Sequence, residues 1–148
     1  MIRDELERIV DEAGALRAVG YFFDPDRPTE IAAVRLMFVD GDWLVSLNRS
    51  DATVELTQTS DDVFDRWRLA NVSGLAPWAD AIGRTALWTR LVEDQLGAPD
   101  AVQFEFVGVP GESSGESLLI QLMTTDIALV VQVVSTLPTP DLAARTRG

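Results

Sequence analysis

The 148-residue sequence contains no cysteine and no histidine, and its twelve basic residues are all arginines. Without cysteine the chain can form neither a disulfide nor a thiolate metal site. Without histidine it lacks the commonest general base at neutral pH, which excludes Ser-His-Asp catalysis, Cys-His catalysis and histidine-bound zinc hydrolysis. Without lysine it cannot form a Schiff base or complete a Walker A loop.

The chain is strongly acidic, with 24 Asp and Glu residues and a formal net charge of −12. Such a charge repels nucleic-acid phosphates and anionic lipid, so we expect no binding to nucleic acid or to membranes. It favours a basic protein partner. Residues 1–10 lack the apolar core of a signal peptide and no apolar run is long enough for a bilayer, so we expect a cytoplasmic protein.

The length fits a single domain, which we place at residues 1–137, followed by a mobile polar tail at 138–148. Within it, residues 117–134 form two apolar runs separated by Thr124, Thr125 and Asp126. The second run is rich in β-branched residues, which is typical of a strand covered on both faces. We therefore predict a β-hairpin at the middle of the fold.

An amphipathic helix is predicted over residues 2–13, because Ile2, Leu6 and Ile9 recur at helical spacing and Gly14 follows as a C-cap. Turn signals and apolar runs then predict four strands. These strands cover residues 15–23, 30–39, 42–48 and 53–57.

Residues 58–76 break this pattern and are interpreted as a connector, in which Ser60 caps a short helix. Pro77 is suited to the first turn of another helix over residues 77–83. Residues 84–96 are ambiguous by periodicity alone. They contain either a strand or the second part of one long helix over 77–96.

An internal comparison favours the strand. Residues 33–39 align with residues 101–107, and residues 44–47 align with residues 119–122. This indicates an internal duplication with pseudo-repeats at about 2–57 and 77–134. The predicted fold is therefore α+β, with two halves that each contain a helix and four antiparallel strands.

Carboxylates are the only potential catalytic groups present in quantity. Asp24 and Asp26, and likewise Asp40 and Asp42, lie beside proline or glycine, where aspartate commonly bonds the local backbone. Their spacing does not match a calcium loop, so we predict no metal and no cofactor. The serines of residues 111–115 are interpreted as part of a hairpin loop, since a nucleophile elbow needs a histidine base.

The tryptophans and the acidic connector supply the candidate binding residues. We expect core positions for Trp43, Trp78 and Trp88. Trp67 differs because it lies in the connector among acidic residues, where an exposed aromatic could anchor a partner; a helix packed over the sheet would explain it equally well. The predicted binding patch for a basic protein consists of Asp61, Asp62, Asp65 and Trp67.

Residues 88–106 read W-T-R-L-V-E-D-Q-L-G-A-P-D-A-V-Q-F-E-F. This run resembles a pattern in small uncharacterised bacterial proteins of the domain-of-unknown-function kind, in which an Asn or Gln-Gly turn leads to an aspartate and an apolar strand. Here Leu96 intervenes between Gln95 and Gly97. The resemblance implies a turn at residues 95–100 and no particular activity.

These features favour a non-catalytic protein-binding module for a basic partner, of which an immunity-type protein that neutralises a basic toxin is one example. The alternative is a carboxylate-dependent enzyme or a small-anion-binding protein with a pocket between the two halves, in which Arg35 or Arg90 holds the anion. A third hypothesis is a structural homodimer formed through an exposed sheet edge.

Overall fold

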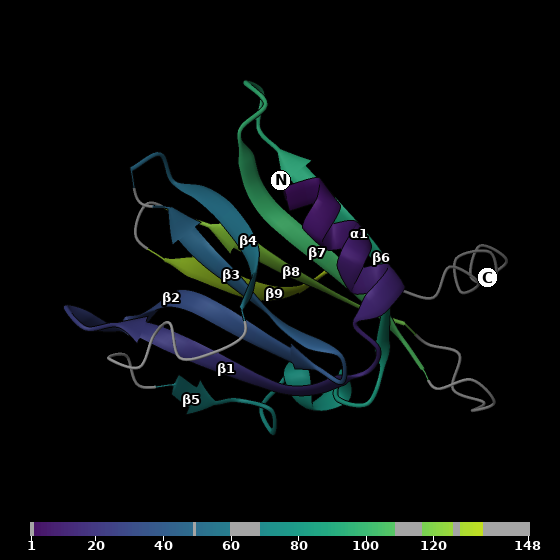
Figure 1. Ribbon diagram of the computed structural model, residues 1–148. Helices are drawn as coiled ribbons and strands as arrows, with labels where there is room; N and C mark the ends of the chain where they lie inside the picture. The colour runs from purple at the N-terminus through teal and green to yellow at the C-terminus, as the bar shows by residue number, and fades with distance from the viewer. Residues whose placement is uncertain (1, 49, 60–68, 109–116, 126–127, 135–148) are drawn as a thin grey trace, which may run out of the picture.

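A computed structural model of the chain describes residues 2–48, 50–59, 69–108, 117–125 and 128–134 (Figure 1). Antiparallel strands dominate this part of the chain, together with one α-helix and one short 3-10 turn. The elements in chain order are α1 (Ile2–Glu12), β1 (Leu16–Asp24), β2 (Arg27–Phe38), β3 (Gly41–Asn48), β4 (Thr53–Thr59), β5 (Leu69–Asn71), η1 (Trp78–Asp80), β6 (Thr85–Glu93), β7 (Pro99–Val107), β8 (Leu118–Thr124) and β9 (Leu129–Val134).

The strands form two antiparallel meanders that join into one curled sheet. The first meander runs β1 to β4, with β5 added on the free edge of β1. The second runs β6 to β9. They meet where Ile31 of β2 pairs with Leu129 of β9, which gives the strand order β4-β3-β2-β9-β8-β7-β6. A second joint forms where the N–H of Leu16 donates to the carbonyl of Arg84 at 2.8 Å.

The helix α1 lies between β4 and β6, the two ends of this strand order, and packs against both (Figure 1). Leu6 and Ile9 on its inner side are buried, while Glu7 and Asp11 on the other side are exposed. Gly14 then adopts a φ of 78°, a left-handed conformation that glycine reaches without strain, and the chain turns into β1. The curl and the helix together enclose one apolar core.

Polar contacts attach α1 to its neighbours. Arg8 donates to the side-chain oxygen of Gln58 on β4 at 2.6 Å, and Arg3 pairs with Glu93 on β6 at 3.2 Å. The buried indole N–H of Trp43 on β3 donates to Glu5 at 2.9 Å. The helix is therefore held by side-chain contacts as well as by its apolar stripe.

The predicted strands are confirmed in outline. Residues 84–96 contain strand β6, so the alternative of one long helix over 77–96 is wrong. Within the predicted hairpin, strands β8 and β9 do pair antiparallel. However, β9 is not covered on both faces, because Val133 is 52% exposed.

The prediction of two helix-plus-strand halves is wrong for the second half. The helix predicted over residues 77–83 is a single 3-10 turn, Trp78–Asp80, and the chain is more sheet-rich than expected. Gly74, Pro77 and Gly83 leave too few residues between them for a nucleated helix to gain from propagation. The connector contains an unpredicted strand, β5, while its predicted helix from Ser60 and the tail at 138–148 lie outside the described residues.

The internal duplication is not shown by the strand pairing. Both meanders have the same order of strands, but their registers differ. Ala33 pairs with Ser46, so the alignment would place its counterpart Ala101 opposite Gln121. Ala101 instead pairs with Met123, two residues further along. A shared meander and similar apolar patterns are thus enough to explain the internal similarity.

The chain's single tyrosine, Tyr21, lies in the wall of the core. The indole N–H of Trp78, which is fully buried, donates to the Tyr21 hydroxyl at 2.6 Å. Burial raises the pKa of Tyr21 above the unperturbed value of 10.0, and the hydrogen bond from Trp78 acts in the opposite direction with a smaller effect. The phenol is therefore held neutral more firmly than in the unfolded chain.

We expect spectrophotometric titration of this single phenol to give a pKa above 10.0 in the folded protein. The folded state then binds the phenolic proton more tightly than the unfolded state, so Tyr21 contributes stability below the unfolded pKa that is lost as pH rises through the folded one. The same titration in denaturant serves as the control. A folded pKa at or below that of the denatured chain would contradict the assignment.

Replacement Ile9→Ala should destabilise the protein by about 2–5 kcal/mol, because Ile9 is fully buried in the core. Chemical denaturation monitored by circular dichroism measures the change. Glu7→Ala on the exposed side of the same helix is the matched control and should change the free energy of unfolding by about 0.5 kcal/mol or less. Similar losses for both variants would show that α1 does not seal the core as described.

Candidate functional site

The outer face of the second meander carries the most distinctive exposed side chains among the described residues. Alternation along β7 directs Val102, Phe104 and Phe106 into the core, where each is fully buried. The residues between them, Gln103 and Glu105, lie on the opposite side of the sheet and are partly exposed. We call this side the Trp88 face and define it by Trp88, Arg90, Gln103, Glu105, Leu119, Gln121 and Gln132.

A β-bulge brings Trp88 onto this face. Ala86 pairs with Phe106 and is buried, whereas Trp88 pairs with Glu105, so Leu87 is an extra residue between two consecutive pairs. In a regular strand without the bulge, Trp88 would lie two residues after Ala86 on the same face and would therefore point into the core. With it, Trp88 is 62% exposed. The bulge therefore places the large aromatic side chain of Trp88 on the outer surface of the sheet and not in the core.

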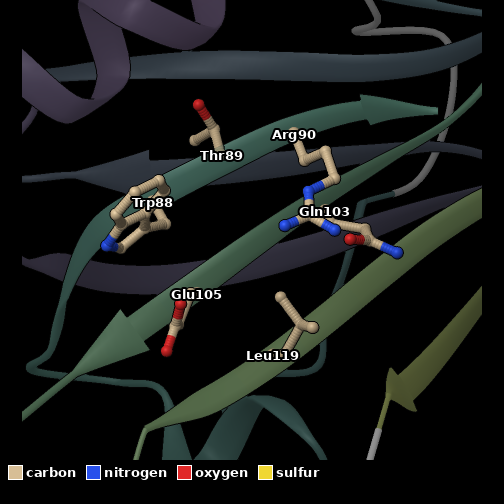
Figure 2. Close-up of a pocket in the computed structure, with 6 residues that line it drawn as sticks. All are labelled: Trp88, Thr89, Arg90, Gln103, Glu105 and Leu119. Carbon is tan, nitrogen blue, oxygen red and sulfur yellow. The ribbon is translucent and has the colours of Figure 1, made fainter.

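Around Trp88 the surface has a hollow of about 270 Å³. Glu105 lies directly across from Trp88 on the neighbouring strand, and Arg90 lies across from Gln103. Figure 2 shows Trp88 and Glu105 at one end of the hollow, Arg90 with Gln103 at the other, and Leu119 on the β8 side. Thr89 completes the lining.

The charged side chains that line the hollow have no polar partner among the described residues. Neither Arg90 nor Glu105 forms a hydrogen bond or ion pair with any residue the structure describes, and the same holds for the indole N–H of Trp88. By contrast Arg35, the other arginine considered for an anion site, donates to Asp42 at 2.7 and 3.0 Å. Of these two arginines, Arg90 is the one without such a pair, and it lies on the outer side of one meander and not between the two halves.

Three glutamines cross the Trp88 face as a ladder. Gln103, Gln121 and Gln132 lie opposite one another on β7, β8 and β9. The Gln103 amide donates to Gln121 at 2.6 Å, and the Gln121 amide donates to Gln132 at 3.0 Å. The ladder fixes a polar but uncharged strip beside Trp88.

Two of the aspartates in the candidate catalytic pairs, Asp24 and Asp42, have structural contacts. Asp24 is buried and accepts the N–H of Asp26 at 2.9 Å, which confirms its turn role. Asp42 instead pairs with Arg35, as described above. Within the described ranges, no three acidic side chains gather closely enough to hold a metal ion.

The predicted patch of Asp61, Asp62, Asp65 and Trp67 lies outside the described residues and stays a prediction, as does the loop at 111–115. Trp43 and Trp78 are fully buried, which confirms their core positions. The prediction for Trp88 is wrong because of the bulge. Leu87 and Trp88 are adjacent large apolar residues, and alternation alone does not tell which of the two faces the core.

None of the helices among the described residues has the length and apolar character needed to cross a bilayer.

Together these features define an antiparallel β domain, closed by one helix, with an open sheet face that presents an exposed tryptophan. The chain belongs to the family of unknown function DUF6334, whose model matches residues 4–135. The resemblance seen in residues 88–106 is thereby confirmed. The predicted turn is present too: Asp94 Oδ1 accepts the N–H groups of Leu96 and Ala98 at 2.8 and 2.9 Å. No curated protein and no solved structure matches the chain.

Proposed function

We propose that this protein is a non-catalytic binding module that recognises a basic protein partner through the Trp88 face. The observation that carries the proposal is the exposure of Trp88, 62%, on a paired strand beside an open carboxylate. A tryptophan in this setting leaves a large apolar surface in water. Covering it with a partner recovers that free energy, which is why tryptophan is enriched among residues that dominate binding.

The composition of the Trp88 face supports a protein partner. Interface centres are enriched in aromatic residues and arginine and depleted of acids. Glu105 is the single acid and Arg90 the single base among the residues that define the face, although the chain contains 24 Asp and Glu. The paired strands hold the backbone of the face in place before binding, so little ordering of the backbone is required when a partner docks.

The charge of the chain supports a basic partner. A net charge of −12 attracts a cationic protein over several ångströms and accelerates encounter. Among the described residues, the acids Asp4, Glu7 and Asp11 lie on α1, away from the Trp88 face. Long-range attraction and close contact are therefore supplied by different parts of the surface. An immunity protein that covers a basic toxin is one example of such a module.

The proposal predicts that a basic protein from the source organism is retained by the immobilised wild-type chain and lost with Trp88→Ala. Truncation of a central aromatic anchor should weaken binding by about 30-fold or more. Retention should also fall as salt rises, because the attraction is screened. Mass spectrometry of the retained proteins and titration calorimetry with the purified partner measure both effects.

Leu75→Ala is the matched control, since Leu75 is 60% exposed but lies between β5 and η1, outside the Trp88 face. It should retain the partner fully. Equal retention by wild type and Trp88→Ala, or a retained partner that is acidic, would overturn the proposal.

A further inference from the structure

The cross-strand pair Trp88 and Glu105 has the parts of a site for a cation. Directly opposed side chains on antiparallel strands have Cβ atoms about 5 Å apart, so a group lying on the indole ring is also within reach of the carboxylate. The face of an indole ring attracts cations, and a guanidinium can stack on it. Neither Trp88 nor Glu105 has a polar partner within the described ranges.

A tryptophan, a carboxylate and a guanidinium already occur together elsewhere in this protein. The guanidinium of Arg8 lies 5.8 Å from the centre of the Trp43 ring, and it also pairs with Glu5 at 3.1 Å. Glu5 in turn accepts the Trp43 indole N–H. An arginine, a tryptophan and a carboxylate thus form a closed set at α1. The pair at Trp88 has the tryptophan and the carboxylate, and both line the hollow.

We infer that the hollow on the Trp88 face receives an arginine side chain of the partner, whose guanidinium stacks on Trp88 and pairs with Glu105. This inference rests on the proposed function and names the chemistry that its site recognises. Leu119 supplies apolar contact for the aliphatic part of the incoming side chain. The planar fork of a guanidinium suits stacking and carboxylate pairing at once, whereas an ammonium offers only a point charge.

Arg90 allows the charge of the bound group to be tested, because Arg90 and Glu105 should have opposite effects on its affinity. It lies at the other end of the hollow, beside Gln103 (Figure 2). Its positive charge opposes a second cation in the hollow, while Glu105 attracts one. Neutralising Glu105 should therefore weaken the binding of a guanidinium, and neutralising Arg90 should strengthen it. An anion held by Arg90 would show the reverse pattern.

The test is a titration of the ¹⁵N-labelled full chain with N-acetyl-arginine amide, followed by NMR. N-acetyl-citrulline amide is the matched probe, because a neutral urea replaces the guanidinium at nearly the same shape. The indole N–H signal of Trp88, identified by its absence in Trp88→Phe, and the amide signal of Glu105 report on the hollow. We expect saturable shifts of both signals with the arginine probe and much smaller ones with citrulline.

The two charge variants should then change the Kd for the arginine probe in opposite directions. Glu105→Gln should raise the Kd for the arginine probe by about 1.5- to 5-fold, the range for an exposed ion pair, and Arg90→Gln should lower it by a similar factor. Unchanged dispersion of the amide spectrum verifies that each variant is folded. Equal shifts with citrulline, absent shifts, or tighter binding by Glu105→Gln would each overturn the inference.

Failure here and failure of the proposed function are distinguishable, because this titration uses no partner protein. Trp88-dependent capture of a basic protein without a response to the arginine probe would overturn the guanidinium and leave the binding module. A selective response to the arginine probe without any captured protein would support the site and count against the protein partner.

Discussion

One helix has to close the gap between the two ends of the curled sheet, and the rest of the structure depends on that closure. The path of paired strands begins at β4 and finishes at β6, and α1 packs against both. Leu6 and Ile9 seal the core, while Arg8 and Arg3 reach one terminal strand each. A half-barrel without this helix would leave its apolar interior open to water.

The closure determines which face of the second meander stays accessible to solvent, and this is the face of the proposed binding site. The helix and β4 pack on the second meander from the inside, where Phe104 and Phe106 meet the core. The opposite side of the same strands therefore stays accessible, and one extra residue, Leu87, adds a large aromatic side chain to it. Stability and the proposed recognition thus depend on opposite faces of the same strands. Under this proposal, substitutions at Trp88 alter binding with little effect on the core.

Much of the fold could be predicted because apolar periodicity reports directly on helices and strands. The helix over 2–13 and seven of the eight long strands follow from it. The strand within residues 84–96 is ambiguous by periodicity and is favoured only by the internal comparison. Two features could not be predicted, each for a physical reason. Strand β5 pairs with β1 only through tertiary contact, and the bulge at Leu87 shifts alternation by one residue. Because of that shift, Trp88, which was predicted to lie in the core, is the centre of the candidate site. The sequence did predict which catalytic mechanisms are excluded, because histidine, cysteine and lysine are absent.

The most direct test of the central claim, that the Trp88 face contacts a protein partner, is site-specific photo-crosslinking in cells of the source organism. A benzoyl-phenylalanine placed at position 88 suits this, because the native residue is already a large exposed aromatic. The account predicts a discrete crosslink to a basic protein from position 88 and none from position 75. A crosslink of equal yield from position 75, or none from position 88 in cells where the partner is captured, would contradict it.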